Sequence, residues 1–352
     1  MGAAHIKGDK MPETSNEKGP VAERASVTAS VPDGAPAGRR RRRIRRIMVR
    51  SMVALVAVVV VAAMGLYAMA NHLESNIRRI PLTLAAAPQD SKRLTVLITS
   101  TQTGPTGLSA PASTATGMIM LLHLNADGQT GGVVSIPPGT VVRVPGHGMT
   151  AIENATVDGG PSLLVRTVQQ LTGVPINHFA RVDFNRMVDL VNAVGGVDVT
   201  IPTAFTSYGH TFAAGVNNLR GVTALYYARD PAISEQTRVL RQQNLLRGAI
   251  DKITHARLLT NPIATIGLLN ALTGALTVDS NFSNSQLLTL VSSFRDVAKS
   301  NGTFLTAPTK VVNGQEVLNS ALSGPLWSAV KNDSLTDFAK QHSSLVTPTT
   351  VP

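Results

Sequence analysis

The feature that most constrains this chain is an uncharged apolar run of nineteen residues, Met52 to Ala70. As an α-helix this run would be about 28 Å long, which is close to the thickness of the hydrocarbon core of a bilayer. Eight arginines lie between Arg39 and Arg50, and the positive-inside rule therefore places the N-terminus in the cytoplasm. The run predicts a single-pass cell-membrane protein whose main domain is extracytoplasmic.

A cleaved signal peptide is the alternative interpretation of the same run. Ala68, Met69 and Ala70 have the small-residue pattern of a cleavage site. However, about fifty residues precede the run, and the run is longer than the usual apolar core of a signal peptide. Both features favour an uncleaved anchor. Beside a membrane span, the arginine block favours contact with anionic lipids over nucleic-acid binding.

The net charge of +11 is concentrated in the N-terminal tail. Residues 1–50 contain twelve Lys or Arg against five Asp or Glu, whereas residues 71–352 contain twenty against sixteen. Aromatic residues make up only 4% of the chain, which disfavours base stacking, and no nucleic-acid partner is expected. The lack of cysteine excludes a disulfide framework, a thiol nucleophile and a cysteine-ligated metal.

Composition divides the chain into five segments. They are a disordered basic cytoplasmic tail (1–50), a transmembrane helix (51–71), a linker (72–93), an α/β domain (94–310), and a C-terminal extension (311–352). The end of the extension is rich in Ser, Thr and Pro and is expected to be disordered.

Within residues 94–310, short apolar runs alternate with helical patterns. Strands are predicted at Leu94–Thr99, Met118–Leu124, Gly132–Ile136, Phe179–Phe184, Val197–Ile201 and Leu225–Arg229, and helices from Pro161 to Leu171, from Arg186 to Val194 and across most of Leu258–Ala298. Ala126–Gln129 is predicted to form a hairpin turn. The pattern predicts a mixed central β-sheet flanked by helices. His123 lies in a strand pattern and is expected to be structural.

The stretch from Tyr227 to Arg247 carries the most distinctive chemistry. At about 100° per residue, Arg238, Arg241 and Gln242 share one face of a predicted helix, and Arg229 approaches from upstream. Three guanidinium groups in one cleft suit a phosphate or pyrophosphate, because each planar group binds two oxygens. The alternative is the solvated face of an amphipathic helix.

Ten short motifs occur in a fixed order along the same region. They are Met118–Leu124, Ser135–Pro137, Val144–Gly146, Gly159–Pro161, Leu171–Gly173, Val182–Phe184, Val194–Val199, Leu219–Gly221, Ala224–Arg229 and Arg238–Gln243. None is specific alone, but the ordered set resembles the LytR-CpsA-Psr family of membrane-anchored cell-envelope proteins. The predicted anchor agrees with this resemblance.

The resemblance implies a function in cell wall biogenesis. Members of the family transfer a glycan polymer from a polyprenyl-pyrophosphate carrier onto peptidoglycan, with arginines on the pyrophosphate, aspartates on Mg²⁺ and an apolar tunnel for the lipid. Transferred by position, the resemblance assigns pyrophosphate binding to Arg229, Arg238, Arg241 and Gln242. The family also carries the label of a cell-envelope-related transcriptional attenuator, but the predicted topology separates this domain from DNA.

The chain departs from the family pattern at four places. Ala115–Met118 replaces an Arg-Ser-Asp-Thr run, Pro138–Gly139 replaces Arg-Asp, Ser100–Gly104 lacks a carboxylate, and Pro231 replaces a second arginine. Among the replaced residues are two carboxylates expected to bind Mg²⁺ and two of the expected arginines, and Glu153 replaces a residue that is usually Asn.

Asp158, Asp183 and Glu235 are replacements for the missing carboxylates only if the fold brings them to the site. The sequence assigns no catalytic residue and no metal ligand. Two functions remain: a phosphotransferase of the LytR-CpsA-Psr type, and a non-catalytic polyprenyl-pyrophosphate binding or scaffold protein of cell-wall assembly.

Overall fold

The computed structural model describes most of the region after the predicted membrane span. The described residues are 77–84, 93–102, 113–183, 185–255, 270–271, 273–283 and 303–351, with Gly267, Gln286, Leu287, Leu290 and Ser293. All belong to one compact unit, Gly65–Pro352. Residues 1–76, which include the predicted tail and span, lie outside them. No helix of the described part is long and apolar enough to cross a membrane.

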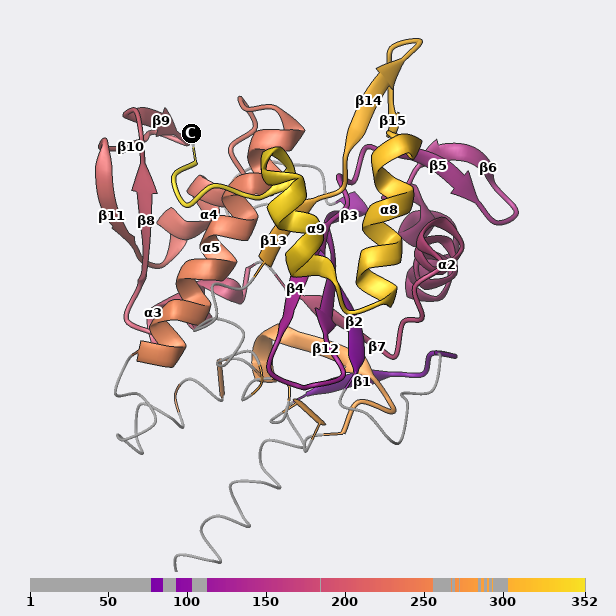
Figure 1. The fold of residues 1–352 in the computed structure, drawn as a ribbon. Coiled ribbons are helices and arrows are strands. Elements are labelled where there is room, and N and C mark those ends of the chain that lie inside the picture. The colour runs from indigo at the N-terminus through magenta and orange to yellow at the C-terminus, as the bar shows by residue number, and fades with distance from the viewer. Residues whose placement is uncertain are drawn as a thin grey trace, which may run out of the picture. The chain divides into compact units, whose positions relative to one another are not determined.

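A seven-stranded mixed sheet forms the centre of this unit (Figure 1). Its order is β1 (Arg78–Ile80), β12 (Leu276–Asp279), β7 (His178–Val182), β2 (Leu94–Gln102), β3 (Ser113–Leu124), β4 (Gly131–Ser135) and β13 (Thr303–Thr306). β2, β3 and β4 pair antiparallel, β7 runs parallel to β2, and β13 runs parallel to β4. The mixed sheet that the sequence predicted is confirmed.

Both faces of the sheet are apolar, because successive residues of a strand point to opposite sides. Val96 and Leu122 face one core, whereas Leu97 and Leu121 face the other. The first core is covered by α3 (Met187–Ala193), α4 (Val222–Ala228) and α5 (Glu235–His255), and the second by α2 (Asn154–Thr172), α8 (Ser320–Lys331) and α9 (Leu335–Gln341). The result is three layers, helix on sheet on helix.

Among the described residues, four two-stranded sheets and one short helix lie outside the central sheet. They pair β5 (Val141–Val144) with β6 (Gly148–Ala151), β8 (Val197–Ile201) with β11 (Gly215–Leu219), β9 (Phe205–Ser207) with β10 (His210–Phe212), and β14 (Thr309–Val312) with β15 (Gln315–Leu318), and the 3₁₀ turn η2 spans Ser343–Leu345.

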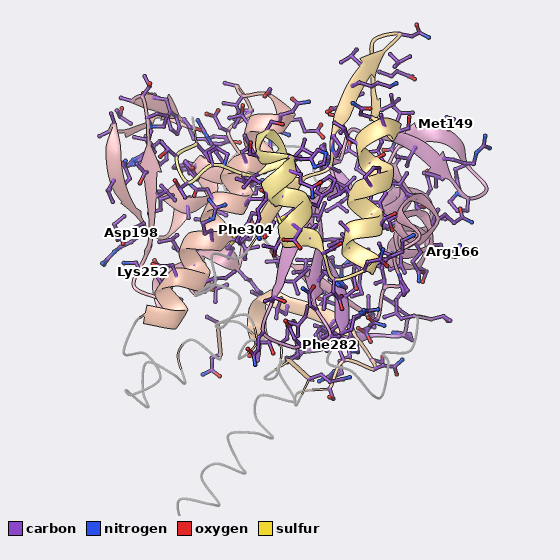
Figure 2. All side chains as sticks on the ribbon, in the orientation of Figure 1. Met149, Arg166, Asp198, Lys252, Phe282 and Phe304 are labelled. Atoms are coloured by element: carbon purple, nitrogen blue, oxygen red, sulfur yellow. The ribbon has the colours of Figure 1, made fainter. Side chains whose placement is uncertain are left out.

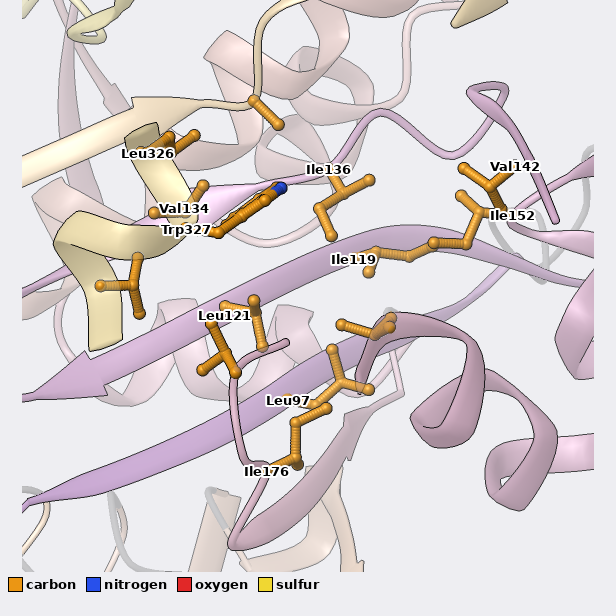
Figure 3. Close-up of a cluster of buried hydrophobic side chains, with 14 of the residues drawn as sticks. Leu97, Ile119, Leu121, Val134, Ile136, Val142, Ile152, Ile176, Leu326 and Trp327 are labelled. Carbon is orange, nitrogen blue, oxygen red and sulfur yellow. The ribbon is translucent and has the colours of Figure 1, made fainter. Parts of the chain in front are cut away.

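The C-terminal region is part of the core, so residue 310 is not a boundary. Trp327 and Leu326 of α8 pack into the same cluster as Leu97 and Leu121 of the sheet (Figure 3). Trp327 is 4% exposed, and its burial alone removes a large apolar surface from water.

The end of the chain is ordered, contrary to the sequence prediction. The Arg247 side chain of α5 donates to the Thr347 and Pro348 carbonyls at 2.9 and 3.0 Å, and its guanidinium covers the Phe304 ring of β13. Phe304, labelled in Figure 2, accepts the Thr347 N–H of this tail at its carbonyl at 2.9 Å. The Ser/Thr-rich composition suggested disorder, but here the backbone groups find partners within the fold.

Four secondary-structure predictions differ from the structure. Residues 225–228 belong to helix α4, where Leu225, Tyr227 and Ala228 are buried at helical spacing, and Arg229 ends that helix. Residues 276–279 form strand β12 inside a predicted helix, and Arg78–Ile80 form β1 inside the predicted linker. Residues 197–201 form a strand, but outside the central sheet. Local composition did not reveal these tertiary pairings.

Asp333 joins the turn before α9 to the sheet. Its carboxylate accepts from Arg93 at 2.6 Å and from the Ala126 N–H at 3.1 Å, and it lies 3.0 Å from Nε2 of the buried His123. Burial raises the pKa of Asp333, but the bonds from Arg93, His123 and Ala126 outweigh it, and the net pKa is lowered. His123 is structural, as predicted.

Asp333→Asn is expected to lower the free energy of unfolding at pH 7 by about 1–3 kcal/mol. A carboxyl group with a lowered folded pKa stabilises the fold above its unfolded pKa, and this stabilisation is lost as the pH falls through the folded pKa. The variant should therefore lose less stability than the native chain on acidification below about pH 4. Urea unfolding at several pH values measures the loss at pH 7 and its dependence on pH. Parallel pH profiles for the variant and the native chain would contradict the lowered pKa of Asp333.

Candidate functional site

Helix α5 lies across the ends of the central strands because its buried face is fixed to them. The Gln243 side chain is fully buried and donates to Ser135 Oγ at 2.5 Å and to the Leu305 carbonyl at 2.8 Å. Val239 and Leu245 are also buried. These contacts hold the first half of α5 above β3, β4 and β13.

The next face of α5 carries Glu235, Arg238 and Gln242, spaced by three and four residues. Glu235 accepts from the Gly139 N–H at 2.7 Å, and Gln242 approaches the Gly117 carbonyl at 3.4 Å. Gly139 follows β4 and Gly117 lies in the neighbouring β3, so this face looks onto the same edge of the sheet. A Cβ atom at position 139 would lie 2.6 Å from Glu235 Oε2, so a larger residue there would displace the Glu235 carboxylate.

The guanidinium groups of Arg229 and Arg238 are close enough for their charges to interact. Both are half-buried. Burial lowers the pKa of Arg229, and the positive charge of Arg238 also lowers it, whereas Tyr208 raises it. Among the described residues, the Arg238 guanidinium has no ion-pair partner. Two cations whose charges interact suit a ligand that carries several negative charges.

Two carboxylates accompany the arginines. The Glu153 N–H donates to the Pro138 carbonyl at 3.1 Å, which places Glu153 at the loop that also holds Glu235. Burial raises the pKa of Glu153, the charge of Glu235 raises it further, and Arg238 lowers it. The sequence left open whether Glu235 reaches the site. The fold places it there, and Glu153 lies beside it.

The two other carboxylate candidates lie elsewhere. Asp158 is 3.6 Å from His147, and Asp183 follows β7 at a different part of the sheet edge. Among the described residues, no group of three or more His, Cys, Asp or Glu side chains is arranged to hold a metal. Glu153 and Glu235 share their space with the Arg238 cation, and one oxygen of Glu235 already accepts a backbone N–H. The described donor set therefore does not fit a resident Mg²⁺.

Arg241 and Gln242, which the sequence grouped with Arg238, are buried. The Arg241 guanidinium lies 3.3 Å from the Asp230 carboxylate and 3.9 Å from the centre of the Phe205 ring. Arg241 is only 2% exposed. Its position favours a structural role beneath the site, where it holds the loop after Arg229 against α5.

The sequence did not point to Tyr208 or Asp230. The Tyr208 hydroxyl donates to the Arg229 carbonyl at 3.1 Å from a hairpin about twenty residues away, and no local pattern predicts that contact. Asp230 could have been predicted from the sequence. A buried arginine such as Arg241 needs a carboxylate partner, and Asp230 is a carboxylate close to it in the sequence.

Comparisons with known proteins agree with the motif order. The sequence model of the LytR_cpsA_psr family matches residues 62–341. The chain is 28% identical over 257 residues to a probable cell wall biosynthesis protein, LcpB, of Corynebacterium glutamicum, covering 68% of this chain and 61% of the relative. It is 32% identical over 186 residues to the polyisoprenyl-teichoic acid–peptidoglycan teichoic acid transferase TagU of Bacillus cereus, covering 51% and 59%.

The chain thus spans about three fifths of the length of these curated relatives. Among solved structures, TagV of B. subtilis superposes with a TM-score of 0.58 at 22% identity, covering 70% of this chain and 98% of that chain. At this identity the likeness shows a shared fold.

Proposed function

The chain belongs to the LytR-CpsA-Psr family, and we propose that it attaches a polyprenyl-pyrophosphate-linked glycan to peptidoglycan. The observation that carries this proposal is the pairing of Arg229 and Arg238 beside Glu153 at one edge of the sheet. The relative TagU is a polyisoprenyl-teichoic acid–peptidoglycan teichoic acid transferase, which supports the choice of substrates.

The two guanidinium groups bind the pyrophosphate and neutralise the charge that spreads over its oxygens during phosphoryl transfer. Arg238 binds the pyrophosphate because its guanidinium has no ion-pair partner among the described residues. Arg229 binds from the end of α4, where Tyr208 holds its backbone. Arg241 and Gln242 hold α5 in place and contribute to pyrophosphate binding only indirectly.

Glu153 acts as the general base. An acceptor hydroxyl of peptidoglycan attacks the phosphorus that carries the glycan, and its proton passes to the Glu153 carboxylate. A new P–O bond forms to the acceptor, the bridging P–O bond of the pyrophosphate breaks, and polyprenyl phosphate leaves. The raised pKa of Glu153 suits this role, because a base works best when its pKa approaches the ambient pH.

Glu153→Gln is expected to lower turnover of a polyprenyl-pyrophosphate glycan about 10²- to 10⁴-fold while its binding is retained, because the amide cannot accept the proton. Single-turnover assays with and without Mg²⁺, together with direct binding, separate the two effects. Asp337→Asn, an exposed carboxylate on α9, is the matched control. Unchanged turnover in Glu153→Gln would remove Glu153 from the mechanism.

The replacement of family residues at this site favours a second function, non-catalytic binding of a lipid pyrophosphate. With two family carboxylates and two arginines replaced, the domain is also suited to hold a lipid pyrophosphate without reacting it. Wild-type protein that binds the lipid through Arg238 but gives no turnover, under conditions where a relative is active, would establish this scaffold role.

We propose that residues 52–70 anchor the protein, with the domain outside the cytoplasm. The uncharged run and the preceding arginines support this topology. Protease added to intact cells is expected to digest the domain. Protection of the domain would contradict the topology and favour the attenuator interpretation.

A further inference from the structure

A polar pocket of about 460 Å³ lies at the ends of β1, β12 and β7. This volume lies within the range of small-molecule sites. The residues that line it and bear on its chemistry are Arg78, Asp183, Arg186, Asn270, Gly274 and Thr277. None of them belongs to the site on α5.

The pocket and the α5 site lie at the same edge of the central sheet. Val182, the last residue of β7, pairs with Ser100 near the end of β2 and with Leu276 at the start of β12. Arg78 begins β1 and pairs with Thr277. β7 is three strands from β4, and neighbouring strands are about 4.8 Å apart, so roughly 14 Å of sheet separates β7, which Asp183 follows, from β4, which leads to the Gly139 loop.

The charges in the pocket are of both signs. Arg78 of β1 and Arg186 before α3 have no ion-pair partner among the described residues. The Arg186 guanidinium lies 3.5 Å from where a Cβ atom on Gly274 would stand. Asp183 uses one carboxylate oxygen to accept the Asn185 N–H at 2.9 Å and also lines the pocket. A simple anion would satisfy the arginines but would be repelled by Asp183.

We propose that this pocket binds an amino-acid group of the acceptor that carries both carboxylate and amine, as the peptides of peptidoglycan do. Arg78 and Arg186 bind the carboxylate, and Asp183 binds the amine. An extended peptide advances about 3.3–3.6 Å per residue, so roughly four residues span the 14 Å of sheet between β7 and β4. This inference rests on the proposed function, because it takes peptidoglycan as the acceptor.

The test is calorimetric titration of the full chain in detergent with a synthetic peptidoglycan tetrapeptide that has free amine and carboxylate groups. Arg186→Gln is expected to weaken peptide binding at least tenfold. Asp183→Asn should also weaken it, and because the amide oxygen still accepts the Asn185 N–H, the turn is kept. Thermal unfolding of each variant checks that the fold is intact.

The sign of the Asp183→Asn effect separates two ligand classes. Weaker peptide binding, with no binding of inorganic phosphate, supports an amine-and-carboxylate ligand. Tighter peptide binding, or competition by inorganic phosphate, would overturn it in favour of a plain anion site.

Arg238→Gln provides the cross-check, since it should weaken a polyprenyl-pyrophosphate analogue and leave the peptide unaffected. If the analogue binds through Arg238 and the peptide does not bind, this inference fails and the proposed function stands. If neither Arg238 nor Arg229 affects the analogue, the proposed function fails, whatever the peptide does.

Discussion

Arg238→Gln is expected to weaken binding of a polyprenyl-pyrophosphate analogue about ten- to hundred-fold, which corresponds to one lost charge-assisted contact of about 1.5–3 kcal/mol. Arg238 is half-buried and has no ion-pair partner among the described residues, so its charge is available to a ligand. Removing it relieves the repulsion that lowers the pKa of Arg229 but also removes the attraction that lowers the pKa of Glu153, so thermal unfolding of the variant checks that the fold is kept.

The combined Arg229→Gln and Arg238→Gln variant should lose more, about 10²- to 10⁴-fold, because both cations of the site are then absent. Arg166→Gln is the matched control. Arg166 is exposed on α2, on the opposite face of the sheet from α5, and Figure 2 shows it far from the α5 residue Lys252. Equal losses in the control and the double variant would show a non-specific charge effect.

Arg241→Ala is expected to lower the free energy of unfolding by about 3–5 kcal/mol. The Arg241 and Asp230 side chains are 3% and 5% exposed, so the change would leave a buried carboxylate without its partner. It would also remove the guanidinium that lies 3.9 Å from the centre of the Phe205 ring and 5.2 Å from the centre of the Tyr227 ring. Chemical denaturation monitored by circular dichroism measures the loss.

Two further variants distinguish this structural role from direct binding. Arg241→Lys keeps the charge but not the planar stack, so it should destabilise the fold by less than the alanine variant. Arg241→Met combined with Asp230→Asn removes both charges and should recover part of the stability. An Arg241→Ala variant with normal stability and no affinity for lipid pyrophosphate would instead support the direct role that the sequence suggested.

The sequence predicted four of the seven strands of the main sheet (β2, β3, β4 and β7), because these buried strands are continuous apolar runs, and it missed β1, β12 and β13. Leu94–Thr99 and Met118–Leu124 sit within β2 and β3, and Ala126–Gln129 is the turn that leads to β4. Both faces of these strands are covered by helices, and such strands read as unbroken apolar segments. The ordered motifs also pointed to the family, which the match over residues 62–341 confirms.

The site was predicted only in part, because helical periodicity gives the direction of a side chain and not its neighbours. Arg241 lies three residues after Arg238, about 60° around the helix, which is enough to turn it under the aromatic rings of Phe205 and Tyr227. The pairing of Glu153 with Glu235 joins residues eighty-two positions apart through the Pro138–Gly139 loop. Local patterns cannot predict such a contact.

The most direct test of the account is a structure of the full chain with a bound polyprenyl-pyrophosphate analogue. We expect phosphate oxygens about 2.7–2.9 Å from the guanidinium nitrogens of both Arg229 and Arg238, with the Glu153 carboxylate facing the phosphorus. A pyrophosphate bound away from both arginines would contradict the account.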